Sequence, residues 1–182
     1  MMETIGTEIR TFYSLRELYD TIEEEIDQYK SIADEYSQWL GLFLRDSKAT
    51  FKNQEWFKNL SMMQKTLKSG NKPQKKEKKP GKKGASSPEW IPYREIMLCA
   101  SEQGQAEIVF EAIETINEKI AQLEKIGNTI KELEKSGLGK GITFVAFIHD
   151  GIPEKLVLQH KEGKELAERF KYIAEFSVSK PA

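Results

Sequence analysis

The sequence predicts a mainly helical protein with a small α+β part towards its C-terminal end. Two long segments repeat apolar residues at heptad spacing, which is typical of long helices that pair with other helices. A lysine-rich segment separates them, and after Gly141 the pattern changes from helical to strand-like. We therefore expect long heptad-patterned helices, arranged as a helical hairpin or coiled coil, followed by a β-hairpin and a terminal helix.

Composition excludes several classes of protein. The 182 residues include 28 basic and 29 acidic side chains and 38% apolar residues, which does not fit a wholly disordered chain. One cysteine excludes a disulfide scaffold, and no apolar run approaches the roughly 18 residues of a membrane span. The N-terminus lacks a basic region followed by an apolar block. We expect a soluble protein of the cytoplasm, without a membrane span.

The lysine-rich segment, residues 71–88, is predicted to be a flexible linker. It contains 7 basic and 1 acidic side chains, three prolines and two glycines, and no aromatic or large aliphatic residue. Such a segment cannot bury enough apolar surface to offset the entropy of ordering it. The predicted division is therefore a helical unit over residues 1–70, the linker, and a second unit over residues 89–182.

The first unit contains a heptad stripe over about four repeats. Ser14 and Glu17 have the spacing of a capping box, so we expect the helix to begin there and to end near Arg45. A second, shorter stripe predicts a helix that folds back over part of the first. The first stripe is Leu15, Tyr19, Ile22, Ile26, Tyr29, Ala33, Tyr36, Leu40 and Phe43, and the second is Trp56, Leu60, Met63 and Leu67.

A third stripe predicts a long helix in the second unit. Ser101 is the expected N-cap and Gly137 the expected left-handed C-cap. Gly127 falls on the stripe, where it marks either a close helix crossing or a kink. The stripe is Ala106, Val109, Ile113, Ile116, Ile120, Leu123, Gly127 and Ile130.

The stripes provide a candidate helix-pairing seam, but the sequence does not determine which helix pairs with it. Aromatic residues in the first unit are expected either to form the core of a short bundle or to line a partner-binding surface. The seam can be completed within one chain, by a second copy, or by a different protein. The candidate seam residues are Tyr29, Tyr36, Leu40, Phe43, Ile113, Ile116, Ile120 and Leu123.

The end of the chain reads as two strands and a helix. Residues 142–149 and 155–160 predict a β-hairpin, with a loop of three to five residues because Pro153 interferes with a tighter turn. The first strand is apolar on both faces, so we expect a third strand from residues 90–98 or pairing across a dimer. After Gly163, a short amphipathic helix is predicted from Leu166, Phe170, Ile173 and Ser177.

Side chains suited to catalysis are few. The two histidines, His149 and His160, would lie roughly 20 Å apart on the predicted hairpin, and Cys99 sits in an apolar run. We therefore predict no catalytic residue, no metal site and no cofactor, and we expect the protein not to be an enzyme.

The lysines of the linker carry the alternative function. A dense group of lysines attracts phosphates without sequence specificity, although a spacer between two acidic units is the other interpretation. The main hypothesis is a non-catalytic scaffold or adaptor that binds a protein partner or itself, with a homo-oligomer expected. The alternative is an accessory nucleic-acid-binding protein with weak, non-specific contacts. The candidate polyanion-binding residues are Lys72, Lys75, Lys76, Lys78, Lys79, Lys82 and Lys83.

Overall fold

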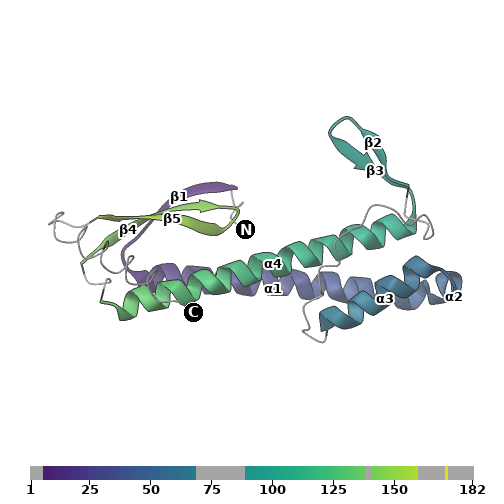
Figure 1. Cartoon of the computed structure of the whole chain (residues 1–182), viewed down its shortest axis with the longest axis horizontal. Helices are drawn as coiled ribbons and strands as arrows, with labels where there is room; N and C mark the ends of the chain where they lie inside the picture. Colours follow the sequence, from purple (N-terminus) through teal and green to yellow (C-terminus); the bar gives the residue numbers. More distant parts are fainter. Residues whose placement is uncertain (1–5, 69–88, 138–140, 160–170, 172–182) are drawn as a thin grey trace. The chain divides into compact units, whose positions relative to one another are not determined.

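The computed structural model describes residues 6–68, 89–137, 141–159 and 171 (Figure 1). It confirms a mostly helical chain with two long helices and a small antiparallel sheet. Whether the heptad stripes form a coiled coil stays a prediction. In chain order the elements are β1 (Thr7–Phe12), α1 (Leu15–Asp46), α2 (Lys48–Phe51), α3 (Glu55–Lys68), β2 (Ile91–Tyr93), β3 (Ile96–Leu98), α4 (Glu102–Lys135), β4 (Thr143–His149) and β5 (Ile152–Gln159).

The chain divides into two compact units. Unit 1 consists of Met1–Gln28 and Lys119–Ala182, and unit 2 of Tyr29–Glu118. Each long helix therefore contributes to both units. The division predicted at the lysine-rich segment falls within residues 69–88, which lie outside the described residues, so that division stays a prediction.

Both long helices begin where their N-caps predict, and α1 ends at Asp46, next to the expected end near Arg45. The backbone N–H of Glu17 donates to Ser14 Oγ over 3.1 Å, and that of Gly104 donates to Ser101 Oγ over 3.1 Å. These bonds satisfy N–H groups that have no partner within a helix. At the other end of α4, Gly137 has a φ of 83°, the left-handed conformation of a C-cap glycine.

Unit 1 contains a three-stranded antiparallel sheet in the order β1–β4–β5 (Figure 1). The alternating burial of β4 places one face against the helices, and four side chains of this face are at most 7% exposed. The helical part of the same core includes Leu18, Ile22 and Leu123. The four buried sheet residues are Phe12, Phe144, Ala146 and Ile148.

The third strand is β1, and the expectation that residues 90–98 would supply it is wrong. β1 pairs along its length with β4, with Thr7 opposite His149 and Phe12 opposite Phe144. Residues 91–98 pair with themselves instead. β1 escapes detection because its sequence, TEIRTF, places charged residues on the side that faces the helices and contributes one buried residue.

The turn between β4 and β5 also differs from the expectation. Asp150 and Gly151 form a two-residue turn, with φ values of 50° and 77°, and His149 pairs with Ile152. Pro153 is accommodated because it lies on an edge strand, opposite Ile148, where the register shifts at a bulge. The ladder therefore loses little from the missing N–H.

Gly127 marks a close helix crossing. A Cβ atom at this position would lie 3.4 Å from Cε2 of Tyr19 on α1, and Gly127 itself is buried. The ring of Tyr19 is also covered by Lys131, whose Nζ lies 4.3 Å from the ring centroid. The distance of 3.4 Å is an ordinary van der Waals contact, so a methyl group would fit between the two helices at this position.

Unit 2 has a core built from three helices. Leu40 and Leu44 of α1 pack with α3 and with the first turns of α4. Leu40 and Trp56 belong to the predicted stripes, but Leu44 lies outside them, and Met63 of the second stripe is 40% exposed. The aromatic rings contact one another: Trp39 and Phe43 stack with centroids 5.4 Å apart, and Phe51 lies 5.3 Å from Trp56. The remaining buried members are Trp56, Phe57, Ala106, Phe110 and Ile113.

Candidate interaction surfaces

The strands β2 and β3 form a hairpin that carries exposed apolar side chains. Ile91 pairs with Leu98, and Tyr93 pairs with Ile96. Because residues two apart on a strand and residues opposite each other share a face, these four side chains lie on one face of the hairpin. We call this set the hairpin face. Its members are 47–58% exposed.

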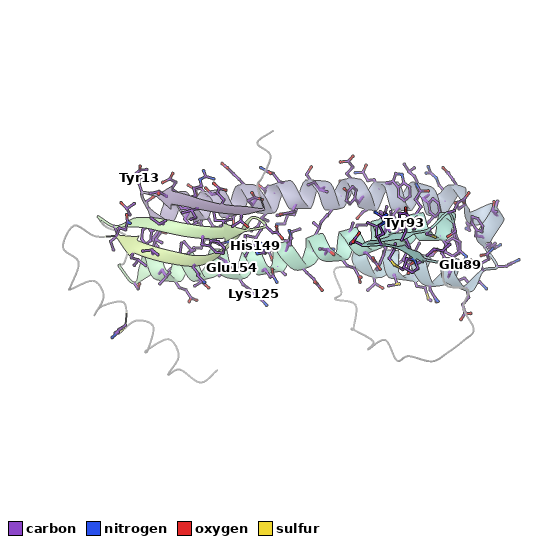
Figure 2. The ribbon with its side chains drawn as sticks, turned by 90° about the horizontal axis from the view of Figure 1, so that it is seen from above. Tyr13, Glu89, Tyr93, Lys125, His149 and Glu154 are labelled. Carbon is purple, nitrogen blue, oxygen red and sulfur yellow. The ribbon has the colours of Figure 1, made fainter. Side chains whose placement is uncertain are left out.

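The reverse side of the hairpin is also uncovered. Pro92 and Met97 pair with each other there, and Met97 is 53% exposed. A two-residue turn joins the strands, and Arg94 in this turn has a φ of 54°, which such tight turns require. Every residue from 91 to 98 is exposed, Tyr93 among them (Figure 2).

The hairpin is fixed at its base to the start of α4. Nε1 of Trp90 donates to a carboxylate oxygen of Glu107 over 3.0 Å. Ser101, the N-cap of α4, also lies 3.2 Å from Sγ of Cys99. A Cβ atom at position 104 would lie 2.5 Å from the same sulfur, so Gly104 is required for this close packing. The strands are therefore anchored at one end while their side chains remain exposed.

The second candidate surface is an apolar groove between α4 and β5, in unit 1. Its volume is about 280 Å³. Leu15, Ile130 and Phe144, each at most 3% exposed, belong to its lining. Half-buried apolar residues complete it from the last turns of α4 and from β5. We call it the β5 groove, and these residues are Ile126, Leu133, Leu156 and Leu158.

A group of charged side chains lies where β1 meets the helices. Glu8 on β1 is placed on the side of the strand that faces α1, opposite Ile148. Burial, and then the nearby Glu8 carboxylate, raise the pKa of Glu25 above its ordinary value, while Lys119 and Arg10 oppose the shift. The group lies within unit 1 and lines the edge of its sheet.

His149 is at the turn end of β4, and Nδ1 lies 3.4 Å from Oε1 of Glu154 (Figure 2). Both side chains are about half exposed. Among the described residues there is no group of three side chains that could hold a metal ion. None of the described helices is long and apolar enough to cross a membrane.

The structure places the predicted seam residues in different environments. Leu40 and Ile113 share the core of unit 2, and Phe43 packs against that core. Ile120 and Leu123 are buried in unit 1. Tyr29 and Ile116 are half-buried, and Tyr36 is 38% exposed. Among the aromatic side chains, Trp56 and Phe57 thus belong to the core and Phe43 packs against it. Pairing of the seam with another chain stays a prediction.

The predicted polyanion-binding lysines, from Lys72 to Lys83, lie outside the described residues, as do His160 and the predicted C-terminal stripe. Sequence reasoning missed the hairpin face. The apolar residues of this segment instead led to the expectation of a third strand of the sheet from residues 90–98. A tight turn at Arg94 and Glu95 between two short apolar segments was the signal that could have found it.

Comparison with known proteins gives no relative from which a function could be inferred. The chain matches no protein-family model, no curated protein and no solved structure.

Proposed function

We propose that this chain is a non-catalytic scaffold that self-associates through the hairpin face. The observation that carries the proposal is the set of four large apolar side chains on one face of β2–β3, each about half exposed. Contiguous apolar patches are uncommon on monomeric surfaces and mark interaction sites. The contact between two copies would stack one hairpin face on the other.

The stability of the hairpin supports the same conclusion. An isolated two-stranded hairpin is marginal in water, and neither face of this one is covered by the described residues of its unit. Stacking two copies face to face would bury both sets of apolar side chains, as in a small β-sandwich. Each partner contributes few residues compared with the 20–30 of a standard interface, so we expect association in the micromolar range.

The test is the mass of the full chain in solution over a wide concentration range. Light scattering after size exclusion, at low and high salt, is expected to show a dimer whose population rises with concentration. Tyr93→Ser combined with Ile96→Ser should shift the midpoint at least tenfold, since apolar contacts carry the association. High salt should not weaken it. A monomer throughout, or a dimer unaffected by the substitutions, would contradict the proposal.

Photo-crosslinking supplies a matched control within the same chain. A photoreactive phenylalanine analogue at Tyr93 is compared with the same analogue at Tyr13, which is 76% exposed and lies in unit 1 (Figure 2). We expect a crosslinked dimer of the purified chain from position 93 and much less from position 13. Equal yields would indicate random collision and would count against the hairpin face.

The lysine tract supports a second candidate function, weak binding of nucleic acid. Seven lysines occur between positions 72 and 83 with Glu77 as the one acidic residue among them. Neutralising phosphates releases counterions, so such binding weakens steeply with salt. Fluorescence anisotropy with a short duplex would show salt-sensitive binding that is lost when Lys75, Lys76, Lys78 and Lys79 become Ala. Unchanged binding would exclude this role for the tract.

A further inference from the structure

The helix-facing side of the sheet in unit 1 is covered unevenly. Phe12 on β1 and Phe144 on β4 are at most 1% exposed, but Leu156 and Leu158 on β5 are half-buried. Residues on this side of one sheet need the same kind of cover. The described helices therefore stop short of the third strand, and the β5 groove is the space that they leave.

The groove has the character of a site for an apolar helix. One wall is the last turns of α4, with Ile126 and Leu133 at helical spacing, and the other is β5. The polar groups of the lining, such as Thr129, Glu154 and Lys155, are exposed. An amphipathic helix could place its apolar stripe between these apolar walls and leave its polar face beside the exposed polar groups.

The chain itself contains a segment that fits. Beyond Gln159, where the described part of β5 ends, 23 residues follow. Leu166, Phe170 and Ile173 are spaced by four and three positions, which places them on one face of a helix. A helix over residues 164–177 would be about 21 Å long. The eight residues of β5 span roughly 26 Å, so the two lengths match.

We propose that residues 160–182 dock in the β5 groove as an amphipathic helix, with Leu166, Phe170 and Ile173 packed against α4 and β5. The groove is thus a helix-binding site that the chain's own C-terminal segment occupies. Leu158, in the wall of the groove, is one residue from the end of β5. A tether this short gives millimolar effective concentration, which favours the chain's own segment over that of a second copy.

Disulfide trapping in the full chain tests the proposal. Cys99, the one cysteine, is replaced by Ser, and Thr129→Cys is combined with Ala167→Cys. Thr129 lines the groove yet is exposed, so its replacement removes no core contact, and Ala167 is next to the stripe residue Leu166 in the sequence. The matched control pairs Ala167→Cys with Asn128→Cys, because Asn128 is an exposed neighbour on α4 outside the groove lining.

The groove pair is expected to form a disulfide within one chain at least tenfold faster than the control pair, as read by mass spectrometry of the separated monomer. Equal rates would overturn the proposal. A disulfide that joins two chains in the groove pair would also overturn it, since a second copy would then be the occupant.

A second measurement does not depend on disulfide geometry. Phe170→Ser should speed hydrogen exchange of the β5 amides about tenfold, because the strand loses its cover. Lys171→Ser, one position away at an exposed residue, should leave exchange unchanged. No difference between the two variants would overturn the proposal. The groove lies in unit 1 and the hairpin face in unit 2, so this result is independent of self-association.

Discussion

The sheet of unit 1 and the hairpin of unit 2 differ in whether their apolar side chains are covered. Both are antiparallel and rich in apolar residues. In the sheet, the helix-facing residues of β4 are at most 7% exposed, whereas the least exposed member of the hairpin face is 47% exposed. Strand-forming sequence alone does not decide whether apolar side chains serve as core or as surface. The difference arises from what the neighbouring helices cover.

The two regions also treat their edges differently. β1 places Glu8 on its helix-facing side and β5 has a bulge with Pro153, and both devices discourage pairing with another strand. The hairpin strands carry neither a charged side chain nor a bulge, and Pro92 is the one such device in them, since their charges are confined to the turn at Arg94 and Glu95. The sheet is therefore protected against pairing at its edges, whereas the hairpin has fewer such devices and leaves its apolar face exposed.

The largest expected effect separates the two regions directly. Phe144→Ala removes a side chain that is 1% exposed at the centre of the sheet and should lower the free energy of unfolding by about 3–5 kcal/mol. Tyr93→Ala removes a comparable ring that is 58% exposed and should change it by no more than about 0.5 kcal/mol. Urea unfolding of dilute protein, followed by circular dichroism, measures both.

Dilution is necessary, because self-association would stabilise the hairpin by mass action. A loss of more than about 2 kcal/mol for Tyr93→Ala in dilute protein would mean that the hairpin face is covered within its own chain. The hairpin and the sheet would then not differ in how their apolar side chains are covered.

Each unit also offers one helix cap of the same chemistry. Ser14→Ala and Ser101→Ala each remove a hydroxyl that accepts an N–H at 3.1 Å, so each should lower the free energy of unfolding by about 1 kcal/mol. Ser101 also contacts Cys99 at the base of the hairpin. We therefore expect its replacement to speed hydrogen exchange in β3, an effect that Ser14→Ala should lack. Identical exchange in both variants would show that the hairpin is not anchored through the cap.

The helix crossing in unit 1 gives a smaller effect of opposite sign. Gly127→Ala removes the helix penalty of glycine, about 1 kcal/mol, and the added Cβ would meet the Tyr19 ring at 3.4 Å, an ordinary contact. A gain of up to about 1 kcal/mol is expected in thermal or urea unfolding. Gly127→Leu should instead lower the free energy of unfolding by about 1–3 kcal/mol through overpacking. A loss with alanine would mean that the helices cross more tightly than the structure shows.

Sequence patterns predicted the helices well because caps and periodicity act locally. Ser14, Ser101 and Gly137 each place a helix end by the groups next to them in the chain. β1 was not predictable in this way, because Ile9 is 75% exposed and Phe12 alone is buried, so the strand has no clear alternation. Its place in the sheet depends on pairing with β4, which lies more than 130 residues away in the chain.

For the hairpin face, the sequence predicted apolar strand-forming residues but not that they would be exposed. The sequence shows an apolar segment over residues 91–98, and that segment does form strands. Whether Tyr93 and Ile96 are covered depends on three-dimensional packing that no local pattern encodes. The seam prediction illustrates the same limit, because Leu40 is fully buried and Tyr36 is 38% exposed on one stripe.

The smallest expected effect concerns the protected edge of the sheet. Because the pKa of Glu25 is raised in the folded chain, its ionised form is less favourable there than in the unfolded chain. Its contribution to stability is therefore most favourable below the ordinary pKa of a glutamate and is lost as the pH rises through the folded value. Glu25→Gln removes this penalty and should stabilise the chain slightly at pH 7, by about 0.5 kcal/mol or less, since solvent screens a partly exposed group.

The gain from Glu25→Gln should disappear as the pH falls below the ordinary range of a glutamate. Glu24→Gln, at an exposed position of α1, is the control, and thermal unfolding between pH 3 and pH 7 measures both. A gain that persists at low pH would mean that packing of the Gln amide causes it. The charged side chains near β1 would then not destabilise the ionised carboxylate of Glu25.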